Sequence, residues 1–473
     1  MSNHAPMAGR LSIPADETAA ETITRPQIVT VAAVVAAVAL ALVLQPIGTA
    51  VMLIAVATMC YVAALVYRMA AFWLSLRHPE IVRISDEEAR AYPEEWLPVY
   101  TVLVPAYKEP TVIASLIARL SEMEYPADKL DIRLLLEEDD TQTIAAALAT
   151  NPGPQFKVVR VPDSQPKTKP KACNYGLATA TGDFVTIYDA EDRPDPLQLR
   201  KAVVAFDQLD DKVACLQAKL SYYNADQNML TRWFTIEYGM WFSNLLPGLV
   251  SQRGPLPLGG TSNHFRNDVL RKVGGWDPYN VTEDADLGIR LARRGYETRV
   301  LDSTTLEEAN SDVINWVKQR SRWYKGYMQT WLVHMRHPVA LVKELGWPGF
   351  IGFNLFVAGT PLLSLINPIF WAMTALWFLI HPPIVLQLFP AWLYYLSLAV
   401  MVVGNVSLFY SWLVSARIAG SRWLVFAALL IPVYWMLMSL AVIKAAVQLV
   451  TAPSFWEKTV HGLDQLPAPK AGN

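Results

Sequence analysis

The 473-residue sequence contains only three cysteines, and their spacing excludes two common kinds of site. Cys60, Cys173 and Cys215 lie far apart, with no Cys-x-x-Cys pair and no Cys/His ligand spacing. A disulfide framework and a structural zinc site are therefore not expected, and a reducing compartment is compatible with the sequence. A charge excess is missing too: the net charge is −2, so nucleic acid is not expected as a partner.

The sequence also lacks the glycine patterns of the common nucleotide-binding loops. There is no Walker segment, and the glycines do not form Gly-x-Gly-x-x-Gly. The sequence therefore supports neither an ATPase nor a dehydrogenase. Internal repeats and long low-complexity tracts are absent as well.

Long apolar runs, in contrast, are present. Residues 1–27 are polar near the start, which predicts a disordered, solvated tail rather than a cleaved signal peptide. Residues 28–68 contain two apolar stretches, each about long enough to cross a bilayer. Arg10 and Arg25 precede the first stretch and Arg68 follows the second, so the positive-inside rule places the N-terminus and the next domain in the cytoplasm. A buried soluble helical hairpin is the alternative.

Residues 95–330 alternate short apolar runs with amphipathic helical stretches, which is typical of an α/β domain with a parallel sheet. Strands are expected at 99–107, 132–140, 156–161 and 183–192. The second strand ends in the acids 138–140, and the fourth ends in Asp-Ala-Glu-Asp, residues 189–192. Because ligands of open α/β sheets bind at the carboxyl ends of the strands, we expect a site there.

The strand-end acids and a nearby lysine run indicate binding of a metal and a phosphate. Asp189 and Glu191 can bind a divalent cation, and oxygen ligands suit Mg²⁺ or Mn²⁺. Such a cation would offset the charge of a diphosphate leaving group. The lysines at positions 167, 169 and 171 can pair with phosphate, although a solvated charged surface explains them too. The acids 138–140 could equally cap the following helix.

Three further acids, Glu283, Asp284 and Asp286, precede a helical pattern that ends at a glycine. A helix cap needs one carboxylate, so three acids beside a Gly-Gly-Trp turn indicate a further role, such as accepting a proton. Gln-Arg-Ser-Arg-Trp, residues 319–323, follows just before an apolar region. Arg binds phosphate oxygens in a bidentate way, and Trp offers a stacking face to a sugar ring. A retaining glycosidase pair is the competing explanation, but it leaves the lysines and the Arg/Trp segment unexplained.

The order of these motifs resembles that of the processive inverting family-two glycosyltransferases, which are membrane enzymes similar to cellulose, hyaluronan and chitin synthases. The matching segments are VPAYKEP, the strand-end acids, KPKACNYGL, DAED, GGTSNHFR, TED and QRSRW. The resemblance is strong over residues 97–331 and loose in the membrane parts. It implies a type-A glycosyltransferase fold, a Rossmann-like and mostly parallel α/β sheet, inserted into an α-helical transmembrane bundle.

The resemblance implies donor and metal roles for residues at the sheet edge. The residues expected around the nucleotide sugar are Pro105, Tyr107, Glu109, Asp139, Lys171 and Asp189. Lys171 would approach the diphosphate. Asp189 and Glu191 stand where the family has Asp-x-Asp for Mg²⁺ or Mn²⁺. The glutamate departs from that pattern, which leaves Asp192 as another candidate for the second ligand.

The resemblance also implies an acceptor side. Asp284 would be the general base, with Glu283 beside it. Gln319, Arg322 and Trp323 would hold the acceptor sugar and the diphosphate. Gly260 and Thr261 are small enough to allow close backbone approach under the acceptor, although a simple turn produces the same spelling.

The remaining segments are expected at the membrane. Residues 315–338 mix Trp and Tyr with Lys and Arg and predict an interfacial helix, which is assigned to residues 331–348, with a soluble surface helix as the alternative. Residues 349–415 predict two transmembrane helices, the first kinked at prolines. Residues 421–450, with Pro432, predict a Pro-hinged interfacial or transmembrane helix. In the tail 451–473, the resemblance implies a gating loop at Phe455, Trp456, Lys458 and Thr459.

These features predict a multi-pass glycosyltransferase of the bacterial inner membrane with a cytoplasmic catalytic domain. It would polymerise a β-linked polysaccharide from a UDP-sugar, either UDP-glucose or UDP-N-acetylglucosamine, and translocate it. Its partners would be the donor, the growing polysaccharide, the lipid bilayer and accessory secretion subunits. Transfer of a single sugar to a lipid carrier is one alternative. A membrane scaffold that kept the fold without turnover is the other.

Overall fold

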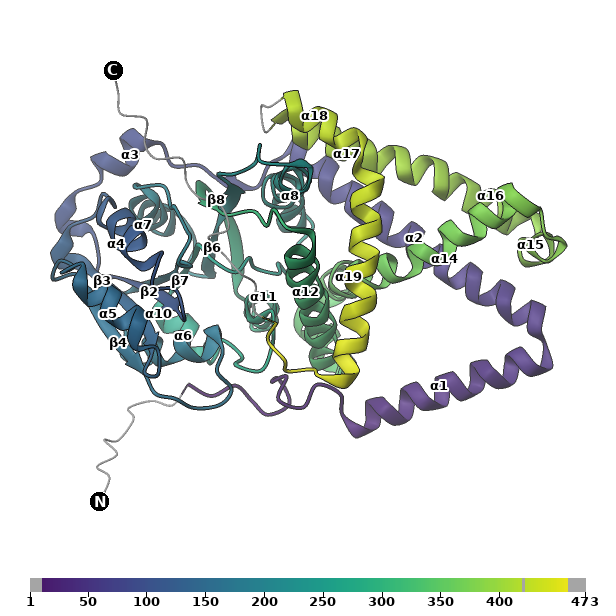
Figure 1. Ribbon diagram of the computed structural model, residues 1–473, viewed down its shortest axis with the longest axis horizontal. Helices are drawn as coiled ribbons and strands as arrows, with labels where there is room; N and C mark the ends of the chain where they lie inside the picture. The colour runs from purple at the N-terminus through teal and green to yellow at the C-terminus, as the bar shows by residue number, and fades with distance from the viewer. Residues whose placement is uncertain (1–10, 419–421, 458–473) are drawn as a thin grey trace.

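A mixed sheet lies in the left-hand part, in the view of Figure 1, of the computed structural model, which describes residues 11–418 and 422–457. The strands are β1 (Ile81–Val82), β2 (Tyr100–Ala106), β3 (Leu130–Glu137), β4 (Phe156–Val161), β5 (Phe184–Ile187), β6 (Val213–Tyr222), β7 (Asn263–Arg266) and β8 (Glu297–Glu307). They form one sheet in the order β1-β8-β6-β7-β5-β2-β3-β4. Only β7 is antiparallel to its neighbours, β5 and β6, so the predicted, mostly parallel sheet is confirmed.

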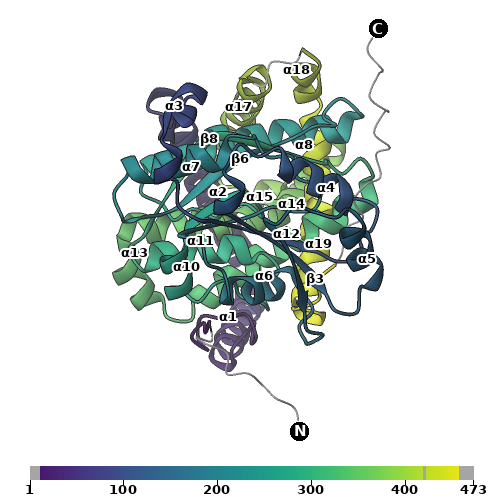
Figure 2. The same cartoon turned by 90° about the vertical axis from the view of Figure 1, so that its left-hand side faces the viewer.

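Alternating side chains of the strands build a core on each face of the sheet. On β2, Val102 and Val104 belong to one core, whereas Leu103 belongs to the other. The first core is covered by α4 (Ile113–Ser121), α5 (Thr141–Ala149) and α7 (Gln198–Gln208). The second is covered by α6 (Lys169–Ala178), α10 (Asn267–Lys272) and α11 (Glu283–Arg293), and Figure 2 shows helices on both sides of the strands. Because the sheet is buried on both faces, the sequences of β2 and β3 are almost continuously apolar.

Most of the other helices extend the molecule away from the sheet, whereas α3 (Asp86–Ala91) lies beside α7 (Figure 1). Besides α3, these helices are α1 (Arg25–Leu44), α2 (Pro46–Arg77), α8 (Met229–Met240), α9 (Leu246–Ser251), α12 (Val313–His334), α13 (Pro338–Phe353), α14 (Gly359–Ile380), α15 (Pro383–Leu388), α16 (Ala391–Ala399), α17 (Asn405–Ile418), α18 (Arg422–Leu429) and α19 (Ile431–Thr451). Within the described ranges, five helical segments are long and apolar enough to cross a membrane: 25–44, 46–77, 338–380, 391–418 and 431–451.

The helix α19 differs in direction from the other long apolar helices. In Figure 1 it runs across the direction of α1, α2, α14 and α17, and both views place it upright. It packs along α12. The break between α18 and α19 lies at Leu430, and Pro432 stands in the first turn of α19. A helix break therefore occurs next to the predicted proline hinge.

Two predicted boundaries need correction. The predicted interfacial helix over 331–348 is wrong as a unit, because α12 continues to His334 and α13 begins at Pro338. Proline is favoured in the first turn of a helix, since its missing N–H has no intrahelical partner there. Within α13, Gly346 has a φ of 67° and bends the chain. The predicted kinked helix after residue 349 begins inside α13, passes through a π-helical turn at Asn354–Ala358 and continues as α14.

The prediction of a solvated, disordered tail is wrong for residues 11–24, because they lie against the domain. Thr18 Oγ1 donates to Asp277 Oδ1 at 2.8 Å, and the backbone N–H of Ala19 donates to Oδ2 at 2.5 Å. Glu17 forms an ion pair with Arg294 at 2.6 Å. These partners lie more than 250 positions away in the chain, so local composition does not reveal them.

Candidate active site

A cavity of about 1020 Å³ lies at the carboxyl ends of the sheet strands and continues among α2 and α14 to α17. Several strands end at this edge, which is why polar residues distant in the sequence converge there. The predicted site residues that line it are Pro105, Tyr107, Glu109, Asp189, Glu191, Gly260, Glu283, Asp284, Gln319, Arg322, Trp323 and Trp456. Asp139, Lys171, Thr261 and Phe455 are not among its lining residues. Lys458 and Thr459 lie outside the described residues.

The mouth of the cavity is bordered by Tyr107 and its neighbours. The Tyr107 hydroxyl donates to Asp139 Oδ2 at 3.3 Å, and Lys167 pairs with the same oxygen at 2.8 Å. The hydrogen bond from Lys167 lowers the pKa of Asp139 below its usual value. The Lys167 ammonium also lies 5.4 Å from the centre of the Tyr107 ring. Asp139 therefore orients an aromatic ring and a cation at the rim.

The structure brings Lys169, rather than the predicted Lys171, to the centre of the cavity. Lys169 pairs with Asp189 and donates to the carbonyl of Gly260 at 2.7 Å. Burial disfavours its charge, but Asp189 and Glu283 outweigh burial and raise the pKa of Lys169 above its usual value. Lys171 instead pairs with Glu137 at 2.9 Å. Residues two apart on a helix point in directions about 200° apart, so only one of these lysines faces the site.

The acidic segment 189–192 divides into two parts. Asp192 is fully buried and its Oδ2 accepts from the backbone N–H of Asp189 at 2.8 Å, so it braces the turn. Thr261 Oγ1 lies within hydrogen-bonding distance of the same carboxyl group and 3.0 Å from the carbonyl oxygen of Ile187, so Thr261 helps to hold this turn. Burial, reinforced by the charges of Asp189 and Glu191, raises the pKa of Asp192 well above its usual value.

Two carboxylates, those of Asp189 and Glu191, consequently remain at the cavity wall. In residues 11–418 and 422–457, no group of three or more His, Cys, Asp or Glu side chains is arranged to hold a metal by itself. Two carboxylates nevertheless fit Mg²⁺ or Mn²⁺, because such ions are commonly held by one or two carboxylates plus substrate phosphates. The site therefore suits a metal that arrives with a diphosphate.

Glu307 is a cavity residue that the sequence analysis missed. It is the last residue of β8, and β8 is absent from the predicted strands. Burial and then the negative charges of Asp192, Asp189 and Glu191 raise the pKa of Glu307 well above its usual value. Glu307 could have been predicted from the sequence, because it is an acid at the end of a strand pattern.

Glu283 and Asp284 occupy the first turn of α11 and face the cavity. Burial, followed by the charge of Asp284, raises the pKa of Glu283 to about 8. Burial also raises the pKa of Asp284, while Lys169 and Arg322 act in the opposite direction. Asp284 Oδ1 accepts from the backbone N–H of Ala285 at 2.8 Å. The pair has the burial and the cationic neighbours of a group that exchanges a proton near neutral pH.

The helix α12 supplies the opposite wall. Trp323 stacks with Tyr238, with ring centres 6.2 Å apart and planes 29° apart. The Arg322 guanidinium lies over the ring of Trp456 at 4.6 Å, and Gln319 accepts from Asn310 at 2.8 Å. This wall presents aromatic faces and a cation to the cavity. These are the kinds of group that the sequence of residues 319–323 contains.

The C-terminal segment crosses α12 and brings Trp456 to Arg322. Lys325 donates to the carbonyl of Phe455 at 2.6 Å, and Gln329 donates to the carbonyl of Pro453 at 3.0 Å. Glu457 pairs with Lys444 of α19 at 2.7 Å. Backbone carbonyls thus tie the segment down, and one aromatic side chain reaches the cavity wall.

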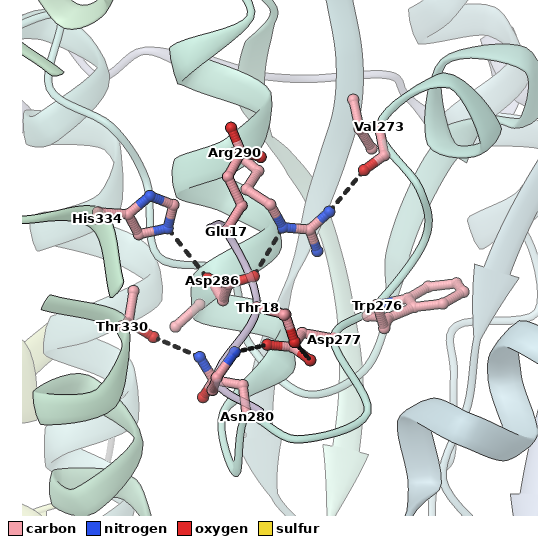
Figure 3. A network of polar contacts seen from close by, with 12 residues as sticks. Glu17, Thr18, Val273, Trp276, Asp277, Asn280, Asp286, Arg290, Thr330 and His334 are labelled. Atoms are coloured by element: carbon pink, nitrogen blue, oxygen red, sulfur yellow. Dashed lines mark hydrogen bonds and ion pairs between the residues drawn. The ribbon is translucent and has the colours of Figure 1, made fainter. Parts of the chain in front are cut away.

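A buried polar network lies behind the acids of α11 (Figure 3). Asp286 accepts from Arg290 Nε at 2.7 Å and contacts His334 Nε2 at 3.0 Å. Arg290 also donates to the carbonyls of Val273 and Gly275, each at 2.7 Å. Burial opposes the charge of Asp286, but Arg290 and His334 together hold its pKa below the usual value. The network connects α11, α12 and the Gly-Gly turn, and so positions the first turn of α11.

Comparisons with known proteins agree with this geometry. Residues 98–326 match the family model described as "Glycosyltransferase like family 2". A probable glycosyltransferase of Bacillus subtilis, YdaM, is 28% identical over 233 residues, which cover 49% of this chain and 55% of that protein. A beta-monoglucosyldiacylglycerol synthase of Synechocystis is 27% identical over 292 residues, 58% of each protein. Cellulose synthase 2 of Novacetimonas hansenii is 26% identical over 54% of this chain and 16% of its own length.

The chain spans about half the length of the first of these curated relatives. Among solved structures, a mannosyltransferase of Pyrobaculum calidifontis in complex with GDP-mannose and Mn²⁺ has a TM-score of 0.50 and 18% identity. The match covers 83% of this chain and 99% of that one. At this identity the likeness concerns the fold.

Proposed function

We propose that the protein, whose residues 98–326 match the model of glycosyltransferase family two, is a membrane-embedded, inverting hexosyltransferase. It extends a β-linked polysaccharide from a UDP-sugar, UDP-glucose or UDP-N-acetylglucosamine, and passes the chain into its own helices. The observation that carries the proposal is the continuous cavity, which joins the acids at the sheet edge to the space among α2 and α14 to α17.

The donor side of the cavity would bind the nucleotide sugar. Pro105, Tyr107 and Glu109, with Asp139 at the rim, would surround the base and ribose. Lys169 takes the diphosphate role first assigned to Lys171, because its ammonium reaches Asp189. Asp189 and Glu191 would hold Mg²⁺ or Mn²⁺, whose charge offsets that of the leaving diphosphate. The Mn²⁺ bound to the archaeal mannosyltransferase makes Mn²⁺ the first metal to test.

Transfer would proceed by one displacement. The Asp284 carboxylate takes the proton of an acceptor hydroxyl while that oxygen forms a bond to the anomeric carbon. The bond between this carbon and the diphosphate oxygen breaks at the same time, which inverts the configuration. Lys169 and Arg322 stabilise the charge that develops on the diphosphate. Glu283, with its raised pKa, lies beside the base and influences its ionisation.

The acceptor would lie between Asp284 and the aromatic wall of α12. Trp323 would stack on a sugar ring, Gln319 would hydrogen-bond to it, and Gly260 would form part of the floor. Beyond them the cavity passes Tyr61, Asn367 and Trp377, a mixture of hydroxyl, amide and aromatic groups that suits a glycan. Phe455 and Trp456 would belong to a lid that excludes water from the donor.

Transfer of a single sugar to a lipid is the second candidate. A specific observation favours it: three relatives of this chain are beta-monoglucosyldiacylglycerol synthases, from Synechocystis, Trichormus and Nostoc. The distal lining of the cavity, including Leu386 and Phe389, also suits a hydrocarbon chain. In both candidates the enzyme resides in the bacterial inner membrane with its catalytic domain in the cytoplasm. Accessory secretion subunits would join only the polymerising enzyme.

A donor screen on the purified protein tests the proposal. Release of nucleoside diphosphate is followed across UDP- and GDP-sugars with Mn²⁺ or Mg²⁺, and the product is sized. We expect one UDP-sugar to give a long product that a β-specific glycosidase degrades. Addition of one sugar to lipid would replace the first candidate with the second. No transfer with any donor or lipid would contradict both.

A further inference from the structure

Arg68 points into the cavity although it belongs to α2, a helix able to cross a membrane. Its Nη2 donates to the hydroxyl of Thr360, and its guanidinium lies over the ring of Phe356 at 5.3 Å. Its Nε is buried without a hydrogen-bond partner. A guanidinium has five N–H donors, so most of the binding capacity of Arg68 is unused by the described residues.

Arg68 also differs from three other cations of the cavity in having no carboxylate partner. Arg320 pairs with Glu237, Lys169 with Asp189, and Lys167 with Asp139. No carboxylate in the described part of the chain forms an ion pair with Arg68. Arg322 forms no ion pair there either, but while burial lowers its pKa, the charges of Glu283 and Asp284 raise it. An unpaired charge away from water is unfavourable, and ionisable residues in membrane helices mark functional sites by default. A negatively charged ligand would supply the missing partner.

The position of Arg68 along α2 indicates where that ligand lies. Arg68 follows Pro46, the first residue of α2, by 22 positions. At about 1.5 Å per residue this separation is about 33 Å. A bilayer has a hydrocarbon core about 30 Å thick. If α2 enters the bilayer at Pro46, Arg68 lies at the level of the lipid phosphates on the side of the catalytic domain.

Arg68 and two acids of α11, Glu283 and Asp284, line the same cavity as Tyr327 of α12. Burial raises the pKa of Tyr327, the charge of Asp284 raises it further, and the charge of Arg68 lowers it. The charges of Asp284 and Arg68 therefore both act on this one phenol. A ligand held by Arg68 would present its neighbouring atoms to Asp284.

On the other side of Arg68 the cavity becomes mostly apolar. Its lining there comes from α14, α15 and the residue that follows α15, and includes Phe370, Phe378, Val385, Leu386 and Phe389. Such a surface accommodates a hydrocarbon chain better than a charged sugar. Together with the depth of Arg68, this lining favours an amphiphile over a soluble anion.

We propose that Arg68 binds the phosphate of an anionic membrane lipid whose hydrocarbon chain lies against α14 and α15 and whose head group reaches Asp284. The inference rests on the proposed function, for which it names the lipid that receives the first sugar. In the single-transfer enzyme this lipid is the acceptor itself. In the polymerising enzyme it is the primer from which the chain starts.

Lipid binding without any sugar donor tests the proposal. The full-length protein in a neutral detergent is titrated with monooleoyl phosphatidic acid and with monooleoylglycerol, which lacks only the phosphate, and adducts are counted by native mass spectrometry. Charge-assisted hydrogen bonds predict that the wild type binds the phosphate lipid about tenfold or more tightly. Arg68→Gln should remove this preference. Arg68→Lys should keep part of it, because lysine retains the charge without the planar fork.

Arg77→Gln is the matched control, because Arg77 stands on the same helix but is exposed and stacks on Trp73 at 4.7 Å. It should bind both lipids as the wild type does. Equal binding of the two lipids by the wild type would overturn the proposal without any variant. So would unchanged selectivity in Arg68→Gln.

Two soluble competitors of the phosphate lipid show whether the anion that Arg68 binds belongs to a lipid. Glycerol 3-phosphate carries the phosphate without the chain, and an oligosaccharide of glucuronic acid carries a carboxylate on a glycan. Displacement of the phosphate lipid by either at a similar concentration would overturn the assignment to a lipid; failure of both would support it. No donor is present, so a protein that transfers no sugar from any donor would still give these results.

Discussion

Nε2 of His334 contacts Oδ1 of Asp286 at 3.0 Å and so joins helix α12 to helix α11. Arg293 Nη1 lies 2.9 Å from Nδ1 of the same ring. Since a guanidinium can only donate, Nδ1 accepts and Nε2 carries the hydrogen that Asp286 receives. The helix with Glu283 and Asp284 is therefore held directly against the helix with Arg322 and Trp323.

Asp286→Asn should destabilise the protein strongly. Asp286 and Arg290 both have no exposed side-chain surface, so the change leaves a buried guanidinium without its counter-charge. Removal of one partner from a buried pair costs about 3–5 kcal/mol. The measurement is the thermal unfolding midpoint in detergent. Asp268→Asn is the control, because Asp268 pairs with Lys272 on the surface and such pairs contribute about 1 kcal/mol or less. Equal midpoints for the two variants would contradict the role of the network.

Gly326→Ala should impair transfer by separating the two helices at the site. A Cβ at Gly326 would lie 2.3 Å from the hydroxyl of Thr282, the residue before Glu283. The added methyl group therefore pushes α12 away from the first turn of α11. We expect a fall in the transfer rate of about tenfold or more, since small misplacements of catalytic groups have effects of this size.

Gly239→Ala on α8 is the control for that substitution. A Cβ at Gly239 has no neighbour within 4 Å. Alanine is favoured over glycine in a helix by about 1 kcal/mol, so this variant should be as stable as the wild type or slightly more so. Unchanged transfer by Gly326→Ala would show that the contact between Gly326 and Thr282 does not set the site.

Asp284→Asn should abolish most transfer while leaving the donor bound. The amide cannot take the acceptor proton, and general-base catalysis contributes about 10²–10⁴-fold. The rate of sugar transfer is measured together with the dissociation constant of the UDP-sugar, which should stay within about twofold because Asp284 is assigned to the acceptor. A variant that transfers at the wild-type rate would rule out Asp284 as the base.

Glu283 should make folding less favourable as the pH rises from about 4.5 to 8. Its pKa is raised from 4.5 to about 8 in the folded protein by burial and by Asp284. Between these values the folded state holds a proton that the unfolded state has released, so stability is highest below the unfolded pKa and is lost as the pH rises. Glu283→Gln should flatten this dependence, whereas the exposed Glu122→Gln should not. Thermal midpoints between pH 5 and 8 provide the measurement, and parallel curves for wild type and Glu283→Gln would contradict the assignment.

The sequence alone was enough to predict the mostly parallel α/β sheet and most of the polar cavity wall. Strand ends are local signals, because an apolar run that stops at acids specifies both the strand and the edge at which those acids lie. Asp189 was found in this way, Asp284 was found as one of three acids ahead of a helical pattern, and Arg322 was found in the segment 319–323; all three line the cavity.

Side-chain direction was not determined by the sequence. Lys169 and Lys171 have similar neighbours in the sequence. Only the orientation of α6 against the sheet brings Lys169 to Asp189 and Lys171 to Glu137. Asp192 looks like a metal ligand in the sequence, yet its burial and its bond to the Asp189 N–H make it a brace. Glu307 became visible once β8 was seen to end at the cavity.

Long-range packing decided the rest. The segment 11–24 reads as a solvated tail, but its partner Asp277 lies more than 250 residues away. Arg68 reads as a marker of membrane orientation, but the packing of α2 against Thr360 and Phe356 turns its guanidinium into the cavity. Local composition sets which elements form and which edge carries polar groups. Which of two similar side chains reaches the site depends on contacts between segments far apart in the chain, and those contacts exist only in the folded protein.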